Sequence, residues 1–427
     1  MLWVMSGIAV SYIVFKVLVR LHISSRAVLL ISFVALNFFM LISLLSVPTH
    51  PVSDYKAIWE SAVAMANGDF DVSHLEWSDY MYIYNWQLGI SALESLVIRI
   101  FGPEFWSIQL LNVLIVNATA MSVYYFAKEV YADNRRTASF TVLILALFWP
   151  FVITVNQFTN QHIAALLILI ILILLKRDSV KIWVLAGLLL AILNIVRPMA
   201  IVLLIAILLY SLWGCGLKNG FKRHIWRFCC LFVVFAAAIS TVDYAFIRAG
   251  YTDSPVSSPK LPWFKFDKGL TGYDAPELGE YDSLEQFNQW EHDKLVDELV
   301  HRPLNVAKYV SGKMIRYLGE WDYKFENTYN HDIRMWYKPG VWQLVMFGWG
   351  QYVLLMIAAA FGYYGYRRSH AFQLWEIVLL GLIAVYFVIE AFSSYRYESY
   401  PLLAVCASSL LNKYAKRRPR SGIRGGA

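Results

Sequence analysis

Long runs of apolar residues, separated by shorter polar stretches, dominate the chain. Most of these runs span roughly 17 to 23 residues, close to the number that a helix needs to cross the core of a bilayer. The pattern predicts about eleven membrane-spanning helices, at about 2–19, 27–47, 105–127, 138–155, 161–175, 180–196, 199–213, 228–248, 341–363, 373–392 and 400–413. We therefore expect an all-α polytopic membrane protein.

Two longer polar segments interrupt this pattern. In the first, apolar residues recur at helical spacing after Asp54 and again after Leu88. The second contains half of the acidic residues of the chain, and helical spacing follows Ser283 and Pro303. The predicted division is two spans in 1–47, a first external loop in 48–104, central spans in 105–248, a second external helical loop in 249–340, final spans in 341–413 and a basic tail in 414–427.

Composition and charge support a membrane protein rather than a nucleic-acid-binding one. The chain is 59% hydrophobic and 16% charged, whereas a soluble domain usually has about a quarter charged residues. The formal net charge of +7 comes from Lys and Arg clusters in short loops between alternate spans. Because positively charged loops stay in the cytosol, we expect a multi-pass cell-membrane protein with both long polar segments on the outer side and the tail inside.

Asp54 is the first candidate for chemistry, because it follows a predicted span and begins an amphipathic helix. It could cap that helix, since Asp favours such positions, but Ser53 could cap it equally well. A carboxylate left free at this point could act as a general base if an acceptor hydroxyl came within hydrogen-bonding reach. Glu76 and Asp79 lie further along the same acidic segment.

Arg197 and Arg396 lie at predicted outer membrane boundaries, where few other basic residues occur. Arginine is costly there unless it is paired or functional. Each could form a salt bridge, with Glu390 as a candidate partner for Arg396, or extend to the interface. Each could instead bind a lipid-linked phosphate, which suits the planar guanidinium group.

Several functional classes lack their sequence signals. The chain contains no P-loop, no glycine-rich dinucleotide-binding turn and no metal-ligand spacing among its histidines and four cysteines. A nucleotide-driven pump is therefore not indicated.

A resemblance emerges from the motifs taken together. The chain resembles GT-C fold glycosyltransferases, and in particular bacterial family 39 relatives of the protein mannosyltransferase and aminoarabinose transferase group. The matching motifs are Ser53-Asp54-Tyr55, Ala66-Asn67-Gly68-Asp69, Tyr84-Asn85-Trp86-Gln87-Leu88-Gly89-Ile90, Phe101-Gly102, Arg197-Pro198, and Glu390 followed by Tyr395-Arg396-Tyr397 and Pro401.

The resemblance implies a GT-C-like bundle and a transferase that uses a polyprenyl-phosphate sugar on the outer face of the membrane. Asp54 matches the family's aspartate, which acts as catalytic base or orients the acceptor. Arg197 and Arg396 would lie near the donor phosphate, with Tyr55 and Tyr397 also binding substrate.

The chain departs from the family at one point. Many members have a second acidic residue and a proline before the second helix of the first loop, where this chain reads Tyr82-Ile83-Tyr84-Asn85-Trp86. Glu76 or Asp79 could supply the second carboxylate. No cofactor follows from the residues, although some GT-C enzymes use a divalent metal ion. The sugar, the acceptor and the oligomeric state stay open.

Two other functions fit parts of the pattern. An envelope polysaccharide polymerase or O-antigen-ligase-like protein also has about a dozen spans and a late outer loop, and it would depend on external arginines such as Arg302 or Arg316. A transporter or flippase would show internal repeats and charges at the bilayer midplane, which the sequence does not.

Overall fold

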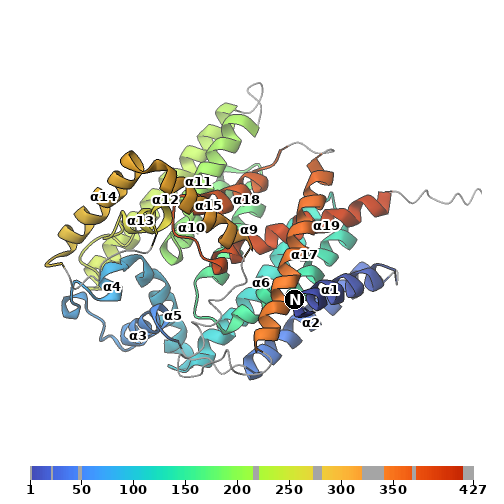
Figure 1. The fold of residues 1–427 in the computed structure, drawn as a ribbon, viewed down its shortest axis with the longest axis horizontal. Helices are drawn as coiled ribbons and strands as arrows, with labels where there is room; N and C mark the ends of the chain where they lie inside the picture. Colours follow the sequence, from blue (N-terminus) through green and yellow to red (C-terminus); the bar gives the residue numbers. More distant parts are fainter. Residues whose placement is uncertain are drawn as a thin grey trace, which may run out of the picture.

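The computed structural model describes residues 2–20, 23–46, 51–214, 221–272, 281–319, 341–367 and 372–416. Within these ranges every regular element is a helix (Figure 1). The stretches that are not described are residue 1 and residues 21–22, 47–50, 215–220, 273–280, 320–340, 368–371 and 417–427. The start of the first predicted polar segment, the end of the second and most of the predicted basic tail therefore fall outside the described ranges.

Helices occupy all of the predicted spans. Four of them are long and apolar enough to cross a membrane individually, namely α2, α6, α12 and α17, and the others are shorter or broken. The all-helical, multi-pass class is therefore confirmed, whereas the count of eleven crossings is not established. The helices are α1 (Leu2–Arg20), α2 (Ser25–Ser46), α6 (Phe105–Val130), α7 (Arg135–Ala146), α9 (Gln161–Leu175), α10 (Val180–Val196), α11 (Ala200–Leu209), α12 (Phe221–Arg248), α17 (Val341–Arg367), α18 (Leu374–Ala384) and α19 (Tyr400–Lys416).

The predicted span at 138–155 is broken. After α7 the chain turns by 74° into α8 (Trp149–Val152) and the 3₁₀ turn η3 (Ile153–Asn156). Pro150 stands in the first turn of α8, where its missing N–H costs little. Gln351 of α17 satisfies the backbone at the break, because its side chain accepts from the Trp149 N–H (2.8 Å) and donates to the Leu147 carbonyl (2.7 Å). Irregular backbone at membrane depth needs such internal partners.

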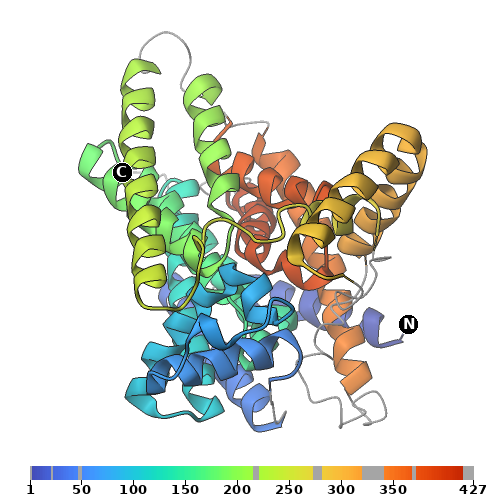
Figure 2. The same cartoon turned by 90° about the vertical axis from the view of Figure 1, so that its left-hand side faces the viewer.

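The polar segments form the helices expected from their spacing, together with shorter ones. The first contains α3 (Asp54–Asn67), the 3₁₀ turns η1 (Val72–His74) and η2 (Asn85–Gln87), α4 (Tyr80–Ile83) and α5 (Leu88–Phe101). The second contains α13 (Phe264–Leu270), α14 (Leu284–His301) and α15 (Pro303–Gly319). In Figure 1 both groups, α3–α5 in blue and α13–α15 in yellow to orange, lie on the left-hand side, and Figure 2 looks onto that side.

Side chains of the first polar segment fasten it to the beginning of the second. The Asn85 amide donates to the carbonyls of Pro255 (3.0 Å) and Ser258 (3.1 Å). The Tyr82 hydroxyl donates to Asp253 at 3.0 Å. Asn85 thus has a structural role that its place in the family-like motif did not reveal. These bonds hold the two segments together above the space described next.

Candidate functional site

A cavity of about 460 Å³ opens between the two polar segments and the ends of the apolar helices. We call it the polar cavity. Its volume lies within the range of small-molecule sites. Its walls combine four charged side chains with amides and many aromatic rings. The lining residues are Ser53, Asp54, Tyr55, Ile58, Tyr80, Tyr84, Trp86, Gln87, Phe158, Thr159, Asn160, Gln161, Arg197, Phe264, Lys265, Glu390, Phe392 and Tyr395.

Asp54 stands at the first turn of α3 and is exposed. Neither it nor Ser53 caps the helix through its side chain. Ser53 occupies the N-cap position without a capping bond, and its hydroxyl instead donates to an Asp54 carboxylate oxygen at 3.2 Å. The Ser53 backbone has a φ of 52°, a conformation that is strained for a non-glycine residue and often accompanies functional sites. The carboxylate is therefore available to the polar cavity.

Arg197 reaches the polar cavity from the C-terminal end of α10 and is fixed by three neighbours. Its guanidinium group forms an ion pair with Glu398 (2.5 Å) and donates to the Asn160 side-chain oxygen (2.8 Å). It also lies over the Tyr395 ring, 5.2 Å from the centroid. Asn160 is itself held by donating to the Val196 carbonyl at 2.9 Å. Glu398 comes from the 3₁₀ turn η8 (Ser393–Ser399), so the ion pair joins two distant parts of the chain.

The structure adds a second charged pair that sequence reasoning missed. The Lys265 ammonium group of α13 forms an ion pair with Glu390, and both line the polar cavity. The sequence offers Glu390 as a partner for Arg396 but gives no signal for Lys265, which lies in a segment that reads as loop. Their meeting depends on how α13 packs against the chain after η7 (Val385–Phe387).

Aromatic rings connect the two polar segments along one wall. Tyr84 packs against Tyr80 (centroids 4.8 Å apart), Trp86 (5.2 Å) and Phe264 of α13 (5.5 Å). Burial raises the pKa of the Tyr84 hydroxyl well above its usual range, and the carboxylates of Asp54 and Glu390 raise it further. The Tyr84 hydroxyl is therefore influenced by carboxylates from two distant parts of the chain, and it stays protonated at physiological pH.

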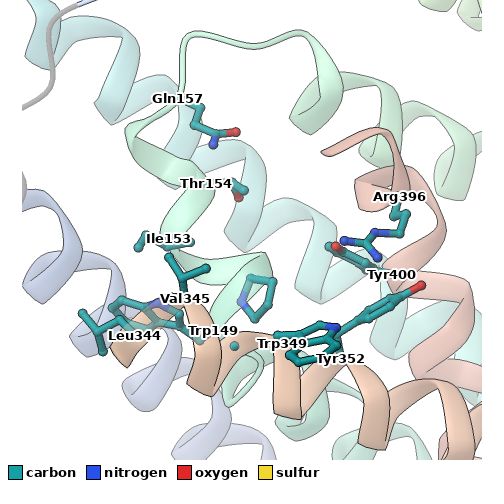
Figure 3. A pocket seen from close by; sticks show the side chains of 12 residues that line it. Trp149, Ile153, Thr154, Gln157, Leu344, Val345, Trp349, Tyr352, Arg396 and Tyr400 are labelled. Atoms are coloured by element: carbon teal, nitrogen blue, oxygen red, sulfur yellow. The ribbon is translucent and has the colours of Figure 1, made fainter. Parts of the chain in front are cut away.

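Of the other substrate-binding residues expected from the sequence, Tyr55 lines the polar cavity, whereas Arg396 and Tyr397 do not. Arg396 borders a separate hollow of about 40 Å³, which we call the aromatic hollow. There its guanidinium group lies over the Tyr352 ring at 4.1 Å from the centroid (Figure 3). Tyr397 is buried in the core, stacked on Phe151 at 5.3 Å.

The two candidates for a second carboxylate also lie outside the lining of the polar cavity. Asp79 precedes α4, and its carboxylate accepts from the Glu76 backbone N–H at 2.7 Å. Glu76 is exposed. The acidic side chain that accompanies Asp54 in the polar cavity is Glu390.

The residues of the polymerase hypothesis lie elsewhere. Arg302 follows α14 and forms an exposed ion pair with Glu298 at 2.9 Å, and Arg316 is exposed on α15. Within the described ranges no three His, Cys, Asp or Glu side chains come together as a metal-binding group.

Comparisons with known proteins support the fold. Residues 88–243 match the dolichyl-phosphate-mannose-protein mannosyltransferase family. Among solved structures, the chain resembles the archaeal oligosaccharyltransferase AglB from Archaeoglobus fulgidus, in complex with an inhibitory peptide and a dolichol-phosphate, with a TM-score of 0.51 and 12% identity. The similarity covers 92% of this chain and 50% of that one, so this chain spans half the length of the archaeal protein. A search of curated proteins finds no significant match.

The helical architecture and the family match together define the class. The chain is a multi-pass membrane protein with the GT-C glycosyltransferase fold. Within that class, the matched region covers α5, the central helices α6 to α11 and most of α12. It includes Arg197 but ends before Lys265 and Glu390 and begins after Asp54.

Proposed function

We propose that this protein is a membrane glycosyltransferase that moves a sugar from a polyprenyl-phosphate donor to an envelope acceptor on the outer face of the cell membrane. The observation that supports this most is the polar cavity, where Asp54 and Arg197 line one space although they lie far apart in the sequence. The names of the matched family and of the archaeal structure both mention a lipid-linked phosphate.

The proposed reaction uses both charges. The oxygen atom of the acceptor's hydroxyl group attacks the anomeric carbon of the sugar, and the bond from that carbon to the phosphate oxygen breaks. Asp54 accepts the proton of the hydroxyl, or orients it. The phosphate leaves with the bonding electrons, and Arg197 stabilises its negative charge. No nucleotide takes part, in keeping with a site on the outer face.

The ion pair with Glu398 gives Arg197 a fixed position in this reaction. A guanidinium group presents five N–H donors, of which Glu398 and Asn160 engage part. The remaining donors can serve a phosphate oxygen, and a group that is already in place costs no reorganisation when the leaving group departs. We assign this role to Arg197 rather than to Arg396.

Replacing Asp54 tests the proposal. In cells that lack the gene, we expect a polyprenyl-phosphate monosaccharide to accumulate and an envelope glycan to lose that sugar. The wild-type gene should reverse both changes. Asp54→Asn should fail to do so, with transfer in isolated membranes lowered by about 10² to 10⁴-fold. Asp79→Asn is the matched control, since an amide oxygen can still accept from the Glu76 N–H, and it should behave as wild type.

Two results would contradict the proposal. Unchanged transfer by Asp54→Asn would remove its catalytic role. Accumulation of long lipid-linked repeat units, in place of a monosaccharide lipid, would favour a polymerase.

A further inference from the structure

Lys265 and Glu390 lie in the polar cavity but have no part in the reaction proposed above. The Glu390 side chain is 8% exposed and that of Lys265 is 36% exposed. Both line the polar cavity, so their exposed surface faces the space that a substrate would fill. A charged pair that only stabilised the fold would not need to contribute to that lining.

The pair is held in place by a close junction between the second polar segment and the chain after η7. The Glu390 backbone N–H donates to the Lys265 carbonyl at 3.0 Å. One turn further along α13, Gly269 packs so closely that any side chain there would collide with the backbone of Val388 and Ile389. The sequence therefore requires a glycine at this contact.

A buried lysine completes the junction. The Lys313 ammonium group of α15 donates to the carbonyls of Gly269, Phe387 (3.2 Å) and Ile389 (2.9 Å). Burial lowers the pKa of Lys313 to about 8, so the group remains mostly protonated at neutral pH. An ammonium group with three carbonyl partners is fully used as a donor. It fixes the residue next to Glu390 and makes Lys313 a positioning residue for the wall.

The chemistry around the pair suits a sugar ring. Two aromatic pairs belong to the same lining: Tyr84 packs against Phe264 with centroids 5.5 Å apart, and Phe392 packs against Tyr395 with centroids 5.4 Å apart. Aromatic walls with a few fixed polar groups are typical of small-molecule sites. A carboxylate accepts hydrogen bonds only, and hydroxyl groups are donors that match it.

We propose that Glu390, held by Lys265 and Lys313, accepts hydrogen bonds from hydroxyl groups of the donor's sugar, and that this end of the polar cavity selects which sugar is transferred. The inference rests on the proposed function, since it assumes a polyprenyl-phosphate sugar in the cavity. It assigns the donor phosphate to Arg197 and the sugar to Glu390, with Tyr395, which contacts both side chains, between them.

Equilibrium binding to the purified full chain in lipid nanodiscs tests the inference. The probes are undecaprenyl phosphate and undecaprenyl-phosphate glucose, mannose and galactose. Mannose and galactose each differ from glucose in the configuration of a single hydroxyl group, at C2 and at C4 respectively. Wild type should bind one sugar-bearing lipid more tightly than the bare phosphate. Glu390→Gln should weaken that binding by about 10- to 100-fold, the loss of a charge-assisted hydrogen bond. It should leave binding of undecaprenyl phosphate within about twofold, which also shows that the variant is folded.

Glu298→Gln is the matched control, because it removes a carboxylate from an exposed ion pair on α14, and it should bind every probe as wild type does. The inference is overturned if Glu390→Gln weakens all probes equally, if it weakens none, or if no sugar of the panel adds affinity to the bare phosphate. In each of these cases binding of undecaprenyl phosphate by wild type leaves the proposed function standing. If wild type binds neither the bare nor the sugar-bearing lipids, the proposed function fails as well.

Discussion

The polar cavity and the aromatic hollow are neighbours in the molecule, and an arginine lines each of them. Phe158 and Tyr395 line the cavity, whereas their chain neighbours Gln157 and Arg396 line the hollow. A single step along the backbone therefore moves a side chain from one space to the other.

The two arginines differ in the contacts described for them and in the room beside them. Arg197 is paired with Glu398 in a cavity of about 460 Å³. Arg396 lies over Tyr352 beside a hollow of about 40 Å³, a volume with room for no more than about three water molecules. A sugar phosphate fits only the first. Two arginines at predicted membrane boundaries can thus have different roles, and the space beside each one decides which.

The largest expected effect comes from breaking the Arg197–Glu398 pair. Arg197→Gln leaves the Glu398 carboxylate, 1% exposed, buried without its cation, which we expect to cost about 3–5 kcal/mol of stability. Loss of the phosphate ligand should also lower transfer by at least about 100-fold. Thermal unfolding in detergent and transfer in membranes measure the two effects.

A double variant separates stability from chemistry. Arg197→Gln combined with Glu398→Gln removes both charges and should recover most of the lost stability, while transfer stays low. Recovery of transfer along with stability would show that Arg197 only supports the fold.

The hydrophobic pattern predicted the location of every apolar helix, because the bilayer allows few alternatives to a helix of the right length. It could not predict the 74° break after α7. That break depends on Gln351, which is distant in the sequence and replaces the hydrogen bonds that a continuous helix would make.

Asp54 could be proposed from the sequence because its signals are local: a span, a helix start and a serine that could cap in its place. Lys265 could not, since it meets Glu390 through tertiary contacts such as the close packing of Gly269 against Ile389. The two arginines could be found but not distinguished. Their difference arises from Glu398 and Tyr352, whose contacts are set by tertiary packing.

Replacing Gln351 tests whether the contacts beside the aromatic hollow stabilise the fold without taking part in transfer. Gln351→Met keeps the length of the side chain but leaves the Trp149 N–H and the Leu147 carbonyl without this partner. We expect a loss of about 2–3 kcal/mol in unfolding free energy, with little change in transfer per folded molecule. Leu354→Met, a near-isosteric change on the same helix, is the control and should cost less than about 1.5 kcal/mol. Equal effects of the two variants would show that the break needs no side-chain partner.

Glu291 gives the second polar segment a stability that depends on pH. It is buried on α14 beside Asp267, Lys268 and Lys294, and burial, reinforced by Asp267, raises its pKa to about 8 while the two lysines oppose the shift. The folded state therefore holds a proton that the unfolded state loses above its ordinary pKa near 4.5. The unfolding free energy is therefore undiminished below pH 4.5 and falls as the pH rises toward 8. Above pH 8 it is lowered by the full cost of ionising the buried carboxyl group.

Glu291→Gln should accordingly raise the unfolding free energy by about 1–2 kcal/mol at pH 9 and leave it nearly unchanged at pH 5. Thermal unfolding of the purified chain at both values gives the measurement. Destabilisation at pH 9 would show that the ionised carboxylate is paired with Lys268 or Lys294 and contributes to stability.

Replacing Arg396 is expected to give the smallest effect. It also tests most directly which of the two spaces binds the donor phosphate. Arg396→Met keeps an unbranched side chain over Tyr352 but removes the cation–π contact, a cost of about 1 kcal/mol. Because the aromatic hollow has no room for a sugar phosphate, the rate of transfer should change by less than about threefold. This corresponds to a change of less than about 1 kcal/mol in the activation free energy of transfer. A 100-fold loss of transfer with normal stability would place the donor phosphate at Arg396. It would also mean that the two spaces join when substrate binds.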